Sequence, residues 1–287
     1  MRPSNHTLLI NSVIGLCKNG DNWIHPFYDL GYTPKLLEHT ISLGSQKGTV
    51  KPDVVAASNK LLNAICFDCK GGRNIEEGQA GRYHDLSSRD LLRWIEVPEP
   101  DKLTHDTCFV GLEENQIDRT HKFDEFPKLI FGKEALRKVG TFSEKKVNDK
   151  LDEPMNLIGG MFPPTLYYPF STTDDPAVML PFVLRALVET SVRQKRSGNR
   201  QVNEGTFDTD DFRIRVHRMW NLMGQETRDA LAIKIRDLVR TVMRRYPQFM
   251  EKVAGGQESS QVILSNLIPL CQKMLADEEK KSRIDDY

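Results

Sequence analysis

Apolar runs and helical periodicities divide the chain into two differently patterned parts. In the first part, short apolar runs at 53–57 and 62–69 are bounded by turn residues and predict adjacent central strands. Further strands are predicted at 107–112 and 128–131, and helices from Pro34 through Ile41 and over 74–84. Because strands are mixed with helices, we expect residues 1–150 to form an α/β or α+β domain.

The second part begins with a segment rich in helix-breaking residues and has helical periodicity after it. Residues 151–180 contain Gly159-Gly160, Pro163-Pro164 and further prolines, which predict a connector between domains. From residue 181 onward, apolar positions recur at helical spacing. Thr209 and Thr227 are suited to cap helices, and a last amphipathic helix is expected over 260–279. Residues 181–287 are therefore predicted to form a helical accessory domain that binds DNA or a partner protein.

Composition removes several classes of function. The chain has 287 residues with 40 basic and 40 acidic side chains, so any attraction to nucleic acid must be local. Five scattered cysteines fit a reducing cytoplasm, and Cys66-x-x-Cys69 lacks a second close pair for zinc. No run approaches the roughly 20 apolar residues of a membrane span. We expect a cytoplasmic protein with no membrane contact.

The chemistry lies in two short motifs, Pro52-Asp53 and, fifteen residues after Asp53, Asp68-Cys69-Lys70. Aspartates at the ends of adjacent strands can share a magnesium ion, with the backbone carbonyl of Cys69 as a further ligand. Side chains alternate along a strand, so Asp68 and Lys70 point the same way. The Lys70 ammonium group is then placed to orient an attacking water and to offset transition-state charge.

These motifs resemble those of the PD-(D/E)xK nuclease superfamily. The resemblance implies a restriction-endonuclease-like mixed sheet flanked by helices, dependence on Mg²⁺ with Mn²⁺ as a substitute, and cleavage of DNA. Gln79-x-x-x-Tyr83 is similar to the extra motif of the RecB- and Cas4-like branch, although the eight residues between Lys70 and Gln79 are a short spacing for it. Four-residue spacing stacks Gln79 and Tyr83 on one helical face. Gln79 is expected near the lysine or water, and Tyr83 near a phosphate.

The superfamily often adds an acidic residue from the helix before the first strand. Glu38, fifteen residues before Asp53, is the candidate there and could bind a second metal ion. His39 competes with it, because RecB-like members use a histidine at this place. Glu76 and Glu77 are weaker candidates on the later helix.

DNA contacts are expected from the accessory domain. Arg236, Arg240 and Arg244 recur every four residues and form a helical stripe suited to phosphate contacts, or else a solvated face beside Asp229 and Asp237. The expected function is a Mg²⁺-dependent DNA nuclease of restriction, phage defence or repair, acting alone, as a homodimer or with an ATPase or helicase subunit. The alternative is a non-catalytic nuclease-fold subunit that binds protein or DNA.

Overall fold

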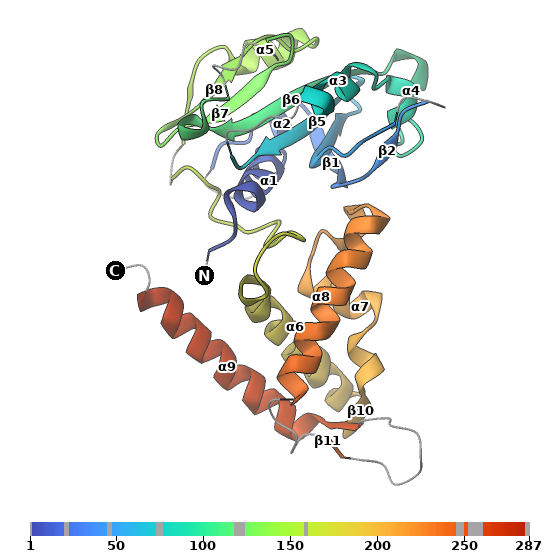
Figure 1. Cartoon of the computed structure of the whole chain (residues 1–287), viewed down its shortest axis with the longest axis vertical. Coiled ribbons are helices and arrows are strands. Elements are labelled where there is room, and N and C mark those ends of the chain that lie inside the picture. The colour runs from blue at the N-terminus through green and yellow to red at the C-terminus, as the bar shows by residue number, and fades with distance from the viewer. Residues whose placement is uncertain are drawn as a thin grey trace. The chain divides into compact units, whose positions relative to one another are not determined.

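The computed structural model folds into two compact units (Figure 1). The sheet unit comprises Ser4–Pro169 and Leu222–Thr227, and the helical unit comprises Met1–Pro3, Phe170–Asn221 and Arg228–Tyr287. The structure describes residues 2–19, 23–44, 48–72, 77–117, 124–157, 160–244, 250–251 and 261–284.

A seven-stranded mixed sheet forms the centre of the sheet unit, in the order β1-β4-β5-β6-β7-β8-β9. β5, β6 and β7 run parallel, and the remaining neighbours pair antiparallel. The bounds are β1 Tyr32–Leu37, β4 Val54–Ser58, β5 Asn63–Lys70, β6 Thr104–Leu112, β7 Lys128–Phe131, β8 Ala135–Val139 and β9 Met155–Asn156. This sheet, with helices on its faces, confirms the predicted α/β class, and four of its strands lie where the apolar runs placed them.

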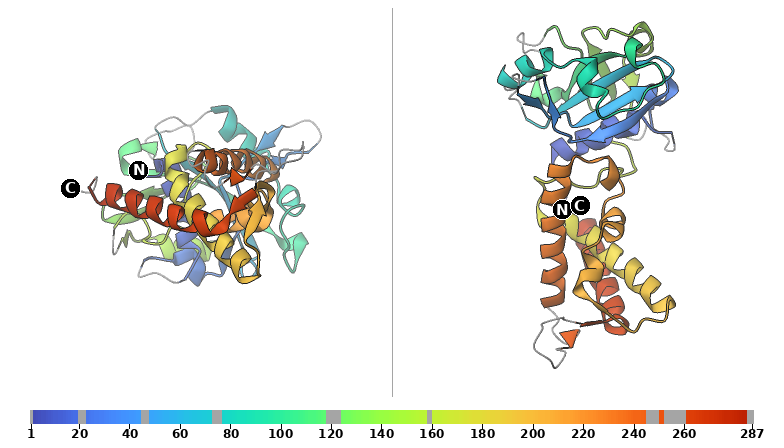
Figure 2. Two further views of the ribbon diagram at one scale, coloured as in Figure 1. Left: turned by 90° about the horizontal axis from the view of Figure 1, so that it is seen from below. Right: turned by 90° about the vertical axis from the view of Figure 1, so that its right-hand side faces the viewer.

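Helices cover both faces of this sheet, with α1 and α3 on opposite sides (Figures 1 and 2). Their bounds are α1 Asn5–Leu16, α2 Pro26–Asp29, α3 Glu77–His84, α4 Ser88–Leu91 and α5 Lys145–Leu151; a small hairpin pairs β2 Ile41–Ser42 with β3 Thr49–Val50, and 3-10 turns are η1 Pro100–Lys102 and η2 Glu113–Asn115. Because β4 and β5 are covered on both sides, all of their residues except Lys70 are buried. Double coverage explains their continuous apolar runs, where a half-exposed strand would alternate.

The helix predicted from Pro34 is wrong, because this segment forms strand β1. β1 is the first strand in the order of the sheet and pairs with β4, with a register shift between Pro34 and Leu36. An edge strand or a bulge tolerates proline, which cannot donate a backbone hydrogen bond. Apolar spacing alone does not distinguish this half-covered, bulged strand from a short helix.

Four helices dominate the described part of the helical unit: α6 Pro176–Arg196, α7 Asp210–Val216, α8 Gln225–Arg244, whose first turn belongs to the sheet unit, and α9 Leu264–Ile284. Small elements are β10 Gln201–Asn203, β11 Met250–Glu251 and β12 Gln261–Ile263, which form one sheet, and the 3-10 turns η5 Glu204–Phe207 and η6 Trp220–Leu222. Thr209 caps α7 as expected, accepting from the Phe212 amide at 3.3 Å. None of the described helices is both long enough and apolar enough to cross a membrane.

The boundary between the parts differs from the expected connector. Residues up to Pro169 belong to the sheet unit, and α6 begins at Pro176 with Asp175 as its N-cap. Pro176 therefore opens the helix at N1, where its missing amide hydrogen costs nothing. Thr227, expected as an N-cap, lies inside α8 instead.

His217 is a fully buried histidine of the helical unit. Its Nδ1 accepts from the Met219 amide at 3.3 Å, so Nε2 carries the proton and donates to the Phe170 carbonyl at 3.2 Å. Burial lowers the pKa of His217 to about 3. A histidine that stays neutral when folded contributes stability above its unfolded pKa of about 6.5, and this stability is lost as the pH falls below that value.

We therefore predict that the wild type loses about 2 kcal/mol more than His217→Gln between pH 7 and pH 5, because only the wild-type unfolded chain gains this proton. Urea denaturation at the two pH values, followed by circular dichroism, measures the difference. His25→Gln, at a half-exposed position, should keep most of the wild-type loss. An equal loss in His217→Gln would contradict the assignment.

Candidate functional site

The β4–β5 hairpin fixes Asp53 at the end of β5. Val54 pairs with Phe67, and the Asp53 amide donates to the Phe67 carbonyl at 2.9 Å. The Asp53 carboxylate turns back onto β5, where its Oδ2 accepts from the Cys69 amide at 2.6 Å. This pairing brings the carboxylates of the two sequence motifs to one edge of the sheet.

Asp68, Lys70 and Gln79 form a closed polar triangle. The Lys70 ammonium lies 2.6 Å from Asp68 Oδ1 and donates to Gln79 Oε1 at 2.8 Å. The Gln79 amide nitrogen completes the triangle by donating to Asp68 Oδ2 at 2.6 Å. Gln79 on α3 thus contacts both the Asp68 carboxylate and the Lys70 ammonium. Its contact with Lys70 is the one expected from the sequence.

Tyr83 lies one helical turn after Gln79 and is buried, with its ring edge-on to Phe109 at 6.1 Å. Burial and then the charge of Asp68 raise the pKa of Tyr83 well above its usual value. Its hydroxyl lies close enough to Asp68 to interact electrostatically but forms no hydrogen bond of good geometry. The expected phosphate contact is therefore not presented in this structure.

Asp68 has a raised pKa, which shows how the charges of the site are balanced. Burial, and after it the neighbouring Asp53 carboxylate, raise the pKa of Asp68 to about 6, against the opposing effect of Lys70. Two carboxylates facing one ammonium leave the site with excess negative charge. Such an arrangement favours a further positive charge close to both aspartates.

Glu38 joins this site from a different element than expected. It follows strand β1 and adopts a positive φ of 42°, and its amide donates to the Asp53 carbonyl at 2.9 Å. Tyr168 donates a short hydrogen bond to its Oε2, and the Thr227 hydroxyl donates to its carbonyl at 3.0 Å. Burial, opposed by this Tyr168 bond and supported by Asp53, raises the pKa of Glu38.

This left-handed backbone conformation is costly for a residue with a side chain. Gly224 allows the close approach that holds it, because a Cβ there would lie 2.9 Å from the Glu38 carbonyl oxygen. Sequence reasoning placed Glu38 correctly beside Asp53, but on a helix that does not exist.

His6 is the residue that sequence reasoning missed. It lies in the first turn of α1, and its Nε2 is 3.1 Å from Asp53 Oδ1. Burial lowers its pKa, but Asp53, Glu38 and Asp68 outweigh burial and raise it overall. His39, the competing candidate, packs its ring on Trp94 at 4.1 Å instead.

Gly71 permits the close approach of His6, since a Cβ at Gly71 would lie 2.8 Å from the His6 amide nitrogen. The Gly71-Gly72 pair marked only the end of a strand in the sequence. No signal distinguishes His6 from the other six histidines before the fold is known.

The donor set fits magnesium in chemistry, since Asp53, Asp68 and Glu38 offer buried carboxylate oxygens. Among the described residues, however, no three acidic, histidine or cysteine side chains converge as a ready-made metal centre. The oxygens of Asp68 are held by Lys70 and Gln79, so an ion would share or displace these donors. The Cys69 carbonyl remains a predicted ligand.

The other predicted residues lie outside this site. Arg236 forms an ion pair with Asp208 at 3.6 Å, and Arg240 is exposed on the same helix. The side chain of Arg244 lies outside the described part of the chain, as do Glu76 and the side chain of Glu77.

We predict that Asp53→Asn lowers the pKa of Asp68, because it removes a like charge, whereas Lys70→Met raises it by removing the opposite charge. Each shift should be about 1 unit or more. Carboxyl ¹³C NMR titration measures them, with Asp101→Asn as an exposed control that leaves Asp68 unchanged. No response of Asp68 to either substitution would mean that the three groups do not share one site.

Comparison with curated proteins found no match, and comparison with solved structures also found none. One family model does match, over just over half of the chain. The matched residues include α1 to α5 and the site residues Asp53, Asp68, Lys70, Gln79 and Tyr83. The match spans residues 5–150, and the chain belongs to the MJECL32 domain family.

Proposed function

We propose that this protein is a metal-dependent DNA nuclease of the PD-(D/E)xK type. The observation that supports it most is the triangle of Asp68, Lys70 and Gln79 beside Asp53. A purely structural ion pair at a strand end needs neither a second buried carboxylate nor a bridging amide. A mixed sheet flanked by helices, as the resemblance implies, also supports the proposal.

Each residue has a role that follows from its contacts. Lys70 is only 11% exposed, so its ammonium acts from a place where charge is weakly screened. There it can orient the attacking water and offset charge on the phosphate oxygens. Gln79 holds this ammonium at 2.8 Å and is a positioning residue, as is Tyr83 beside Asp68.

Asp53 and Asp68 would hold the divalent ion, with Glu38 or the Cys69 carbonyl as further oxygen donors. Bound there, Mg²⁺ or Mn²⁺ supplies Lewis acidity towards the phosphate and acidifies a water. His6 touches Asp53 and has a raised pKa, so it competes for the same carboxylate when protonated. A fall in pH should therefore weaken metal binding in two ways, by protonating Asp68 and by charging His6 beside Asp53.

The direct test incubates the full chain with plasmid and linear DNA in Mg²⁺, Mn²⁺ or EDTA. We expect metal-dependent cleavage that falls below a pH of about 6, where Asp68 gains a proton. Asp68→Ala and Lys70→Ala should each lose about 100- to 1,000-fold or more in rate. Gln79→Ala and Tyr83→Phe should lose about 10-fold, as positioning residues do.

Lys60→Ala is the matched control, because Lys60 lies at the exposed turn of the same hairpin. It should cleave like the wild type, and all variants should show the wild-type circular dichroism spectrum. Cleavage by Lys70→Ala at the wild-type rate, with the same metal dependence, would exclude the proposed active site.

A second candidate is a non-catalytic subunit that keeps the nuclease fold. It is favoured by the closed triangle, in which both Asp68 oxygens already have partners, and by the missing ready-made metal centre among described residues. This candidate predicts DNA or protein binding without cleavage in either metal. The complete set of Asp53, Asp68 and Lys70 favours the enzyme.

DNA affinity is proposed to come from α8. Substituting Arg236, Arg240 and Arg244 with Gln should weaken binding to all sequences and reduce the salt slope by up to about 3 units. Because Arg236 is already paired with Asp208, we expect Arg236 to contribute less than one full unit to this reduction of the salt slope. Anisotropy at several salt concentrations measures both quantities.

The matched control substitutes Lys60, Lys145 and Lys146 with Gln, since these exposed side chains carry the same total charge. An equal effect of both triple variants would show a general charge effect, and no effect of the arginine variant would remove α8 from DNA binding.

A further inference from the structure

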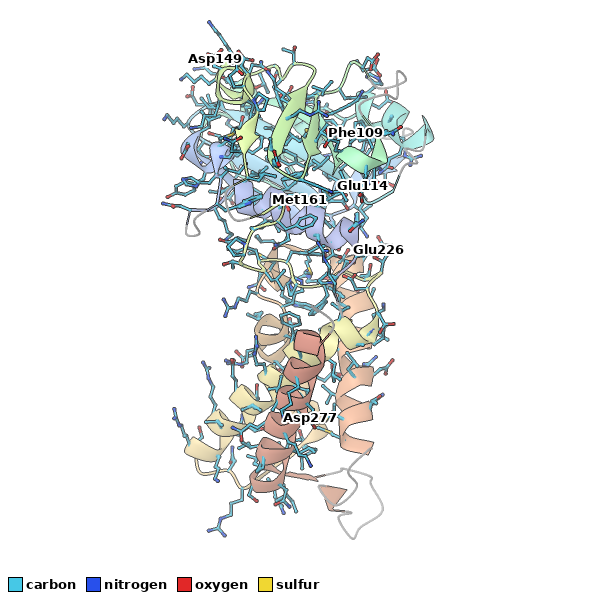
Figure 3. All side chains as sticks on the ribbon, turned by 90° about the vertical axis from the view of Figure 1, so that its left-hand side faces the viewer. Phe109, Glu114, Asp149, Met161, Glu226 and Asp277 are labelled. Atoms are coloured by element: carbon cyan, nitrogen blue, oxygen red, sulfur yellow. The ribbon has the colours of Figure 1, made fainter. Side chains whose placement is uncertain are left out.

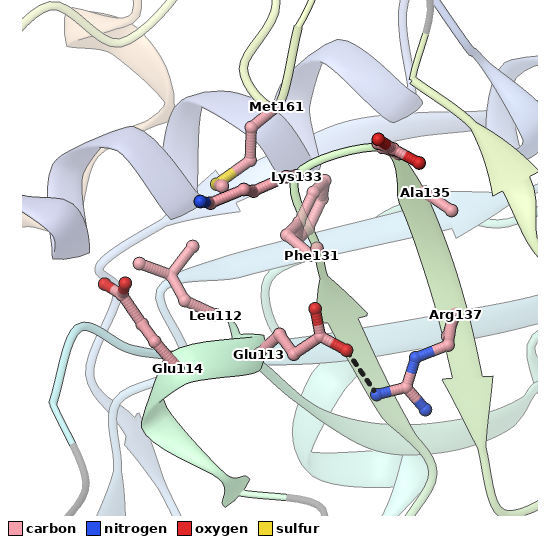
Figure 4. A pocket seen from close by; sticks show the side chains of 10 residues that line it. Leu112, Glu113, Glu114, Phe131, Lys133, Ala135, Arg137 and Met161 are labelled. Carbon is pink, nitrogen blue, oxygen red and sulfur yellow. Dashed lines mark hydrogen bonds and ion pairs between the residues drawn. The ribbon is translucent and has the colours of Figure 1, made fainter.

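A pocket of about 540 Å³ opens at the ends of β6 and β7 (Figure 4). Its volume lies within the range of about 300–1,000 Å³ that is typical of small-molecule sites. Leu112, Phe131 and Met161 give it apolar walls, and charged side chains surround them. Figure 3 places Glu114 and Met161 in the sheet unit, on which the whole pocket is built.

This pocket lies at the same end of the parallel strands as the candidate active site. β5, β6 and β7 are parallel and adjacent, so Lys70, Leu112 and Phe131 all lie at their carboxyl ends. Two strand spacings separate β5 from β7 by about 10 Å. Turn η2 links the two places directly, because Asn115 donates to the Lys70 carbonyl at 3.2 Å.

The pocket does not duplicate the acidic site. Lys70 pairs with Gly111 across the sheet, so Leu112 and its partner Phe131 point to the opposite face. A DNA strand held at Lys70 would pass over the carboxyl ends of the strands to reach the pocket.

Its charges are poorly suited to phosphate and well suited to a base. Three glutamates and two basic residues line it, so the formal charge is negative. Glu113 is engaged by Arg137 at 3.4 Å, and Figure 4 shows Glu114 and Lys133 with Leu112 between them. A carboxylate accepts hydrogen bonds from the exocyclic amino groups of bases, as glutamate does from cytosine N4.

We propose that this pocket binds an amino-bearing nucleobase of the substrate strand, close to the scissile phosphate. Glu114 accepts from the exocyclic amino group, the walls formed by Leu112 and Met161 pack on the ring, and Lys133 contacts the neighbouring phosphate. Thymine, which presents a carbonyl oxygen and a methyl group in place of an amino group, is discriminated against. The inference deepens the proposed nuclease function and rests on it only for the identity of the substrate.

The test measures binding without cleavage. Fluorescently labelled oligonucleotides, one of thymines alone and others with a single cytosine at each successive position, are titrated with the full chain in EDTA. At one position cytosine should bind about 10-fold more tightly than thymine, as expected for a hydrogen bond to a charged group. Glu114→Leu should abolish the preference, and Lys133→Ala should weaken both oligonucleotides alike.

Glu96→Leu, an exposed control outside the pocket, should keep the preference. Equal binding of cytosine and thymine at every position overturns the inference, and so does a preference that survives Glu114→Leu. Cleavage with Mn²⁺ separates this result from the proposed function: a preference without cleavage supports the pocket and not the nuclease, whereas cleavage without a preference does the reverse.

Discussion

The antiparallel pairing of β4 with β5 is the constraint on which the rest of the site depends. Its register sets Asp53 against Asp68, and the 2.6 Å bond from the Cys69 amide locks the first carboxylate onto the second strand. A slip of one residue would send Asp68 and Lys70 to the opposite face, away from Gln79. Both strands are buried on both faces, so a slip would place every side chain in a close-packed space shaped for a side chain of another size. Packing therefore contributes to the geometry of the site.

This dependence explains why much of the site could be predicted from sequence. Buried strands leave continuous apolar runs, and alternation along β5 fixes the direction of Asp68 relative to Lys70. The four-residue spacing of Gln79 and Tyr83 likewise survives folding, because it is local to α3. These predictions used contacts between residues near in sequence, where geometry follows from one element.

The remaining features depend on contacts between distant segments. Pro34 suggested a helix start, but pairing with β4 made the segment an edge strand. His6 reaches Asp53 only because α1 packs at the end of β5, against Gly71. Glu38 depends on Tyr168 and Thr227, more than a hundred residues further along the chain. Periodicity carries no information on such partners.

The most direct test of the central claim is the binding of Mn²⁺ to the full chain by calorimetry at pH 7.5. Excess negative charge at Asp53 and Asp68 predicts saturable binding that Asp68→Asn weakens at least about 10-fold and that protons suppress near pH 5.5. Lys70→Met, which removes the competing ammonium, should bind at least as tightly as the wild type. Unchanged Mn²⁺ affinity in Asp68→Asn would contradict the account.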